Sequence, residues 1–216
     1  MTVRFRTISL AATATAAAAS ALTYPFLPKR AAIHFDVDGQ PERYSSRTSA
    51  VATFPALMAG LVVANDRLGA WPGGQDWEDG AAGVQARDQA IALIEMALLP
   101  THLGALANGA GVRVDMSRMN RAVYGLTMIA LGNVMPRLPR NGLVGIRTPW
   151  TLADPAVWER THRVAGYLVA AAGLAELASL PMSGKRAARL QRAALIGAVG
   201  LSVAYSLVAY ARRARG

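Results

Sequence analysis

Cysteine is absent from this chain of 216 residues. Its absence excludes disulfides, thiolate nucleophiles and the zinc or iron–sulfur sites that depend on cysteine ligands. A hydrolase triad, a phosphate-binding P-loop, a dinucleotide-binding fingerprint and an HExxH metal motif are also missing. The sequence therefore predicts neither a cofactor nor an enzyme, and a membrane enzyme that uses Glu95 and His102 stays open as an alternative.

Charged residues are scarce as well, at 17% of the chain against about 25% in an average soluble domain. Apolar residues make up 53% of the chain, and its mean hydropathy is +0.25. Apolar runs near the length of about 17 to 25 residues that crosses a bilayer recur between polar connectors. We predict an all-α, polytopic transmembrane helix bundle with six spans, at residues 7–24, 48–64, 87–107, 119–135, 163–182 and 188–210.

The net charge of +10 does not by itself indicate a nucleic-acid partner. The basic residues lie mainly in the connectors and at the termini, and no basic run is interleaved with aromatic residues. A cation beside a membrane attracts anionic lipid by about 1 kcal/mol. We therefore expect the lipid bilayer of the cell membrane, and not nucleic acid, to be the direct partner.

The first apolar run has two interpretations. Arg4 and Arg6 precede an Ala-rich run that ends near Pro25, and residues 19–21 have the small-residue pattern of a signal peptidase site. The run is either a first span or a cleaved signal peptide, whose removal would leave five spans. We favour the span, because apolar runs continue along the whole chain.

A polar connector follows at residues 27–47. His34, Asp36 and Asp38 stand at alternate positions, which would place three metal ligands on one side of an extended segment. Such a site usually needs a further donor from elsewhere. We therefore favour a compact turn with its corner at Asp38 and Gly39.

The third apolar run carries a polar stripe. Asp88, Glu95 and His102 are seven residues apart, so on a helix they lie within about 40° of one another. Glu95 would lie near the middle of the membrane, where an ionisable group costs at least about 2.5 kcal/mol. It is either a functional group, as in a proton relay, or part of a hydrogen-bonded clamp to another span. Candidate clamp partners are Glu176, Asn133, Thr101 and Ser179.

Residues 132–166 form the most distinctive segment, with two Trp, two Arg-Thr pairs and four Pro between apolar runs. Thr148 before Pro149 predicts an extended entry. Thr151 or Asp154 can cap a short helix that has Pro155 at its first position. The segment is thus expected to be a structured loop that leads into the fifth span.

Three side chains of this loop suit the membrane surface. Arg147 can bind a phosphate headgroup or a carboxylate through two hydrogen bonds. Trp150 and Trp158 are expected to lie in the interface, where aromatic rings concentrate. For each residue taken singly, an interfacial belt explains its presence as well as a binding site does.

The order of these residues resembles the signature of the SdpI family of bacterial membrane proteins. The motif consists of GN, MP and N, then GIRTPWTL, VW, THR and G. The matching positions are Gly132, Asn133, Pro136, Asn141, Gly145, Arg147, Thr148, Pro149, Trp150, Thr151, Trp158, Thr161, His162, Arg163 and Gly166. The connector at 27–47 is similar to a domain of unknown function found at the start of this family, although Ala32 and Ser45 replace its usual Pro and Gly.

The resemblance implies an immunity protein that protects its host from a secreted membrane-active toxin, and that in some members tethers a cytoplasmic transcriptional repressor. Basic residues are nearly evenly divided between the two sides, so charge does not decide the orientation. The resemblance implies that both termini and the 141–162 loop are cytoplasmic and that the His34 connector is external. Toxin-binding or partner-binding candidates are His34, Gly39, Tyr44, Asn133, Asn141, Arg147, Thr148, Pro149, Trp150, Trp158 and His162. Glu95, His102 and Glu176 are the expected intramembrane polar groups.

We expect three units: a two-span unit at 1–66, an acidic loop with the third span at 67–118, and a three-span unit at 119–216. A small proton-coupled transporter and a structural membrane module remain the alternative functions.

Overall fold

The computed structural model of the chain describes residues 5–36, 38–70, 81–140, 144–182 and 184–214. Its helices are α1 (Phe5–Thr23), α2 (Arg47–Ala70), α3 (Ala81–Gly109), α4 (Met116–Val134), α5 (Pro149–Ala153), α6 (Pro155–Ala178) and α7 (Gly184–Arg213). Short 3-10 turns η1 (Tyr24–Phe26) and η3 (Met135–Arg137) follow α1 and α4, and strands β1 (Arg30–Phe35) and β2 (Pro41–Ser46) stand between α1 and α2. The predicted all-α membrane helix bundle is confirmed, with one small hairpin added.

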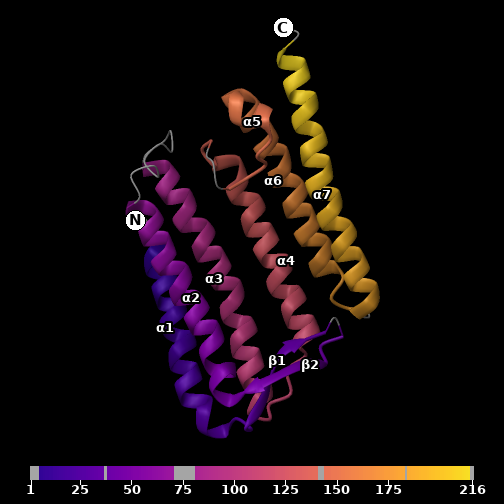
Figure 1. Cartoon of the computed structure of the whole chain (residues 1–216). Coiled ribbons are helices and arrows are strands. Elements are labelled where there is room, and N and C mark those ends of the chain that lie inside the picture. The colour runs from indigo at the N-terminus through magenta and orange to yellow at the C-terminus, as the bar shows by residue number, and fades with distance from the viewer. Residues whose placement is uncertain (1–4, 37, 71–80, 141–143, 183, 215–216) are drawn as a thin grey trace.

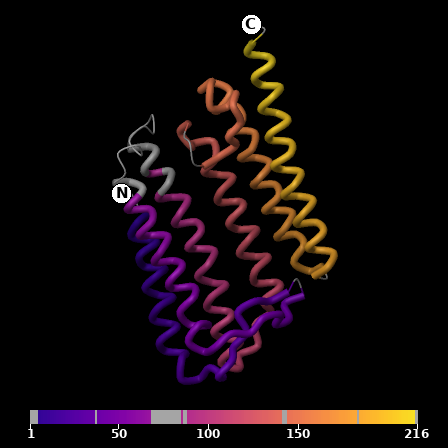
Figure 2. Tube along the Cα trace, in the orientation of Figure 1, coloured from indigo at the N-terminus to yellow at the C-terminus, as the bar shows by residue number. Residues whose placement is uncertain are grey.

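The six long helices run alternately in opposite directions (Figure 1). The start of α1, the end of α7 and the short helix α5 lie at one end of the bundle, which we call the terminal end (Figure 1). The β1–β2 hairpin, the α3–α4 connection and the α6–α7 turn lie at the other, the hairpin end (Figure 2). This arrangement places the His34 connector and the GIRTPWTL loop at opposite ends, as the predicted topology requires.

The helices pack in two groups of three. α1, α2 and α3 contact one another around Ala12, Ala16 and Met58, and α4, α6 and α7 pack around Val134, Leu138, Ala165, Val169 and Ala198. Contacts between α3 and α4 join the groups. α1 thus packs as part of the first group, and its interpretation as a span stays a prediction.

Glycines allow α4 and α6 to lie unusually close. Gly125 faces Gly173, and Gly132 faces Gly166. A Cβ on Gly132 would lie 2.6 Å from the carbonyl oxygen of Gly166, and one on Gly173 would lie 2.5 Å from that of Gly125. Backbones approach this closely only where no side chain intervenes. The close approach of α4 and α6 therefore depends on glycine at these positions.

Three helical segments are long and apolar enough to cross a membrane, as judged by length and composition over the described residues. They are Arg47–Arg67, Asp88–Gly109 and Gly184–Arg213. The other long helices, α1, α4 and α6, are not among these candidates. The count of six spans stays a prediction.

The outward face of α7 is apolar, with Ile196 71% and Leu201 59% exposed. A Cβ on Gly197 or Gly200 would meet nothing within 4 Å. Gly197 and Gly200 therefore make no close helix contact with the described residues, because α7 turns them away from its neighbours. Such a face suits lipid.

Candidate functional site

The loop before α6 is held in place by His162. Its side chain is buried, and Nε2 accepts a hydrogen bond from the backbone N–H of Ile146 at 3.0 Å. Nδ1 therefore carries the proton of the neutral ring and donates to the carbonyl of Trp158 at 2.9 Å. Gly145 has φ +121°, and a Cβ there would lie 2.2 Å from Nε2. Glycine is required at this position on both grounds.

Both tryptophans of the loop make specific contacts. Trp158 is 3% exposed, donates from Nε1 to the carbonyl of Leu138 at 2.8 Å, and stacks on His162 with ring centroids 3.9 Å apart. The expectation that Trp158 lies in the interface is thus wrong, because α6 directs it into the bundle. Trp150 is partly buried, and its Nε1 donates to Ser206 Oγ of α7 at 2.8 Å. This hydrogen bond from Trp150 therefore connects the loop to α7.

Two caps shape the backbone between these contacts. Thr148 has extended backbone angles and forms a capping box with Thr151 at the start of α5, and Pro149 takes a first-turn position. Asp154 caps α6, since its Oδ1 accepts from the N–H groups of Ala156 at 2.7 Å and Val157 at 3.3 Å. The predicted extended entry and the predicted cap at Asp154 are confirmed.

Arg147 is the candidate of this loop that is free to meet a partner. Its side chain is exposed and makes no hydrogen bond or ion pair with any residue that the structure describes. Asn133 is also exposed, but its Oδ1 accepts from Arg137 Nη1 at 3.0 Å. Asn141 lies outside the described residues. Arg147 is therefore an exposed cation of this loop that pairs with no described residue, and it stands on a backbone held by hydrogen bonds.

At the hairpin end, the connector forms two antiparallel strands, which the compact turn predicted for it did not include. The turn itself is confirmed: Asp36 Oδ1 accepts from the N–H groups of Asp38 at 2.9 Å and Gln40 at 2.8 Å, and Gly39 has φ +79°. A Cβ on Gly39 would lie 2.8 Å from the backbone nitrogen of Ser117, so the turn rests on the start of α4.

The side chains predicted to meet a toxin are exposed on this hairpin. His34 lies 3.7 Å from Glu42, and both side chains are more than 60% exposed. Tyr44 is 49% exposed and lines a cavity of about 180 Å³ beneath the hairpin. Among the described residues, no three His, Asp or Glu side chains gather as a metal site would need. The metal alternative is thus not supported, because Asp36 serves the turn.

The predicted polar stripe on α3 is present and faces α1 and α2. Glu95 is fully buried, and its Oε2 accepts from Thr13 Oγ1 at 2.9 Å. His102 is also buried, with Nε2 2.8 Å from Ser20 Oγ. The two pairs are each 82 residues apart in sequence, as expected for parallel helices in register. Asp88, one heptad earlier, accepts from Asn65 of α2 at 2.7 Å.

The clamp partners proposed from the sequence are not the ones found. Thr101 bonds to Asn120 at 3.2 Å, and Ser179 donates to the carbonyl of Glu176. Glu176 lies in the second helix group, on α6, and is 2% exposed. The partner of Glu95 is α1 instead, because α1 and α3 run parallel and in contact.

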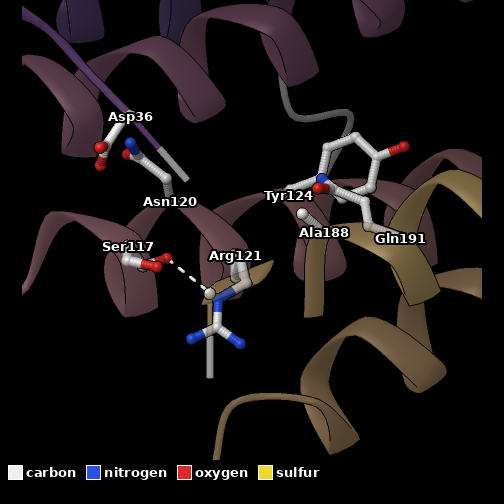
Figure 3. A pocket seen from close by; sticks show the side chains of 8 residues that line it. Asp36, Ser117, Asn120, Arg121, Tyr124, Ala188 and Gln191 are labelled. Atoms are coloured by element: carbon white, nitrogen blue, oxygen red, sulfur yellow. Dashed lines mark hydrogen bonds between the residues drawn. The ribbon is translucent and has the colours of Figure 1, made fainter. Parts of the chain in front are cut away.

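Sequence reasoning missed a cavity of about 240 Å³ at the hairpin end. It is lined by Asp36, Ser117, Asn120, Arg121, Tyr124, Gly184, Ala188 and Gln191, which come from the hairpin turn, α4 and α7 (Figure 3). Arg121 is 8% exposed and donates from Nη1 to the carbonyl of Ser179 at 2.8 Å. The available signal was Arg121 near the start of the fourth apolar run, since a charged residue within a span faces protein or water.

Comparison with known proteins gives two family matches. Residues 137–210 match the SdpI/YfhL protein family, and residues 11–59 match a domain of unknown function, DUF1648. This chain carries an SdpI/YfhL family segment. The segment runs from η3 through the loop and α6 into α7, and the second match covers most of α1, the hairpin and the first half of α2.

One curated relative of this chain is the immunity protein SdpI of Bacillus subtilis (strain 168). It is 34% identical over 71 residues, which are 33% of this chain and 34% of that protein. The match thus spans about a third of the length of this relative. No solved structure matches. Arg147, Trp150, Trp158 and His162 lie inside the SdpI/YfhL segment, whereas Glu95 and His102 lie outside both matches.

Proposed function

We propose that this membrane protein protects its host cell from a secreted, membrane-active toxin. The observation that carries the proposal is the SdpI/YfhL family match over residues 137–210, together with 34% identity over 71 residues to an immunity protein. The DUF1648 match covers the hairpin at the opposite end. The proposal therefore involves both ends of the bundle.

In this proposal the protein lies in the cell membrane with the hairpin end outside and the terminal end in the cytoplasm. The exposed His34 and Tyr44 then meet the toxin from outside. The exposed Arg147 faces the cytoplasm, where its guanidinium suits a carboxylate on a transcriptional repressor. Binding at one end reaches the other through α4 and α6, whose close glycine contacts leave little room for independent movement.

A survival assay tests the protective role. The gene is expressed in a host that is sensitive to the toxin of an SdpI-type operon, and survival is compared for wild type, Tyr44→Ala and Arg147→Ala, with Arg160→Ala as control. Arg160 is exposed and basic like Arg147 but belongs to α6. We expect wild type, Arg147→Ala and Arg160→Ala to protect, and Tyr44→Ala to protect less.

Repressor tethering has a separate measurement. The fraction of a fluorescently tagged repressor at the membrane is compared between the same variants, and we expect it to fall for Arg147→Ala but not for Arg160→Ala. Equal loss in both variants would point to general electrostatic attraction. If the wild-type protein protects against no toxin of this kind, the immunity proposal is rejected.

The buried stripe favours a second candidate, a small proton-coupled transporter. Glu95 and His102 are ionisable groups at membrane depth, and Glu95 Oε1 has no partner among the described residues. Glu95→Gln removes the titratable group, and Gln can still accept from Thr13. If a proton flux across vesicles containing the protein is lost in Glu95→Gln but kept in the surface variant Glu159→Gln, the transporter is favoured.

A further inference from the structure

The cavity of about 180 Å³ beneath the hairpin has one face of the β1–β2 ribbon as its first wall. Ala32 faces Tyr44 across the two strands, Phe35 faces Pro41, and all four residues line the cavity. Successive residues of a strand point to opposite faces, so Ala32 and Phe35 would lie on opposite sides of a regular hairpin. The register shifts between them bring both to the cavity side. The hairpin is thus irregular in the way that this wall requires.

The end of α3 forms the second wall. Asn108 and Gly109 line the cavity, and the side-chain nitrogen of Asn108 donates to the carbonyl of Val114 at 2.9 Å. A Cβ on Gly109 would lie 2.6 Å from Cδ2 of Leu27, whose side chain is 2% exposed. The chain that enters the hairpin therefore rests directly on α3, and the two walls are held together.

Arg30 gives the cavity its charge. Among the described residues that line the cavity, Arg30 is the one that is charged at neutral pH, and none is an aspartate or a glutamate. The Arg30 side chain is exposed and makes no hydrogen bond or ion pair with a described residue. The hydroxyl of Tyr44 is a further donor of the lining. A guanidinium binds phosphate and carboxylate oxygens through paired hydrogen bonds, so the cavity selects an anion.

Acidic side chains of the hairpin end do not line this cavity. Glu42 lies 3.7 Å from His34, Asp115 lies 3.4 Å from Arg118, and Asp36 accepts hydrogen bonds within the turn. The remaining lining beside Arg30, Tyr44 and Asn108 is apolar or backbone, from Pro28, Ala31, Ala32, Phe35, Pro41 and Gly109. The ligand that fits is therefore an anionic group attached to an apolar one.

The cavity lies at the depth of lipid headgroups. The candidate span Asp88–Gly109 ends at a residue of the lining, and the candidate span Arg47–Arg67 begins directly after β2. A helix of 22 residues is about 33 Å long, which matches a hydrocarbon core of about 30 Å. The ends of these spans thus lie at the boundary between hydrocarbon and headgroups, whichever side of the membrane the hairpin occupies.

We propose that this cavity binds the phosphate of an anionic phospholipid, with Arg30 and the Tyr44 hydroxyl as donors and the apolar wall against the glycerol and the first acyl carbons. A volume of about 180 Å³ is below the roughly 300 to 1,000 Å³ of sites for drug-sized ligands, so it suits a headgroup and not a whole molecule. The inference goes beyond the immunity function and does not depend on it, because the bilayer supplies the ligand.

Thiol labelling of the full-length chain in dodecyl maltoside micelles tests the occupancy of the cavity. The chain has no native cysteine, so Ala32→Cys places a single thiol in the lining. Its rate of reaction with uncharged N-ethylmaleimide is measured with dioleoylphosphatidylglycerol or with zwitterionic dioleoylphosphatidylcholine at the same mole fraction. A lipid bound at Arg30 shields the thiol, so phosphatidylglycerol should slow the reaction about fivefold more than phosphatidylcholine.

Adding Arg30→Gln should abolish this difference, whereas Arg30→Lys, which keeps the charge, should retain most of it. Arg43→Gln is the matched control, because Arg43 is an exposed cation of the same hairpin that does not line the cavity. Glu42→Cys reports any effect of lipid charge on an exposed hairpin thiol and should react equally with both lipids. Equal loss in Arg30→Gln and Arg43→Gln would show general attraction to a charged surface and overturn the site.

Two soluble probes separate the lipid from other anions. N-acetyl-leucine carries a carboxylate beside an apolar side chain, as the end of a peptide does, and glycerol 3-phosphate carries the phosphate without acyl chains. Neither should slow the labelling of Ala32→Cys at the concentration at which phosphatidylglycerol does. Slowing by N-acetyl-leucine and not by phosphatidylglycerol would assign the cavity to a peptide, and equal slowing by glycerol 3-phosphate would assign it to a soluble phosphate. Each of these results overturns the lipid proposal.

Discussion

At the residue scale, the buried polar side chains of the first helix group form pairs in a fixed register. Thr13 pairs with Glu95, and one heptad later Ser20 pairs with His102. One heptad before Thr13, Arg6 pairs with Asp66 at 2.9 Å and is also attracted electrostatically by Asp88. Each pair holds α1 against its neighbours by a directional bond. In a bilayer, an apolar side chain gains little by leaving lipid for protein, so apolar contact alone does not fix which helices pack together. Hydrogen bonds of this kind supply that specificity.

Thr13→Val tests the value of one such pair. Removing the hydroxyl leaves the Glu95 carboxyl without a donor among the described residues, and an unsatisfied buried group costs about 1 to 3 kcal/mol. The thermal midpoint of the protein in detergent should fall. Thr15→Val is the control, because its hydroxyl is exposed and bonds only within α1, to Ala11 at 2.8 Å. Equal midpoints for both variants would show that the Thr13 contact adds no stability.

At the element scale, caps and close contacts position the loop and its helix. α6 begins at Pro155 with Asp154 as its cap, and Arg213 near the end of α7 lies 3.3 Å from the same carboxylate. Burial alone would raise the pKa of Asp154, but the N–H groups of Ala156 and Val157 and the Arg213 guanidinium together lower it. The cap thus joins the start of α6 to the end of α7.

This cap predicts a loss of stability in acid. The pKa of Asp154 is lower in the folded than in the unfolded protein, so its contribution is present above the unfolded pKa of about 3.9 and is lost as pH falls through the lower folded value. Thermal midpoints in detergent should drop less between pH 5 and pH 3 for Asp154→Asn than for wild type. An identical decline in the two proteins would place the acid sensitivity elsewhere.

The contact between α4 and α6 depends on the absence of side chains. In Gly132→Ala the new Cβ would lie 2.6 Å from a backbone oxygen that cannot turn away, so we expect a loss of about 1 to 3 kcal/mol. Gly197→Ala is the control, because its Cβ meets no atom within 4 Å and alanine favours the helix. Thermal unfolding of the two variants measures the difference. A stable Gly132→Ala protein would mean that α4 and α6 separate without cost.

On the scale of the whole molecule, the bundle separates the two matched family regions in space. The hairpin lies at one end, and the SdpI/YfhL loop lies at the other together with the start of α1 and the end of α7 (Figure 1). A protein built this way can meet different partners on the two sides of a membrane. The orientation decides which partner each end meets.

Cysteine accessibility in intact cells measures that orientation. We expect Glu42→Cys, on the hairpin, to react with a membrane-impermeant thiol reagent, and Ala153→Cys, at the end of α5, to react only after lysis. Both positions are exposed, and the chain has no native cysteine. Glu42 is preferred to Gly39, whose positive φ and contact with Ser117 disfavour a side chain. Labelling of Ala153→Cys but not Glu42→Cys would reverse the topology.

The sequence by itself determined the helices, because apolar length and periodicity are local properties. It also determined the stripe of Asp88, Glu95 and His102, which follows from heptad spacing, and the cap at Asp154, which follows from its place before Pro155. The family resemblance rested likewise on residues in a row. The two strands were missed because the connector lacks the clear alternation that marks a strand.

Only the tertiary structure decided which residues meet. Thr13 is the partner of Glu95 because α1 and α3 lie parallel and in contact. The sequence pattern of neither helix shows that the two helices are neighbours. His162 supports the loop because Gly145 approaches its ring from 17 residues earlier in the sequence. Cavities such as the one around Arg121 arise where three elements converge, and a chain shows their residues only as separate polar positions.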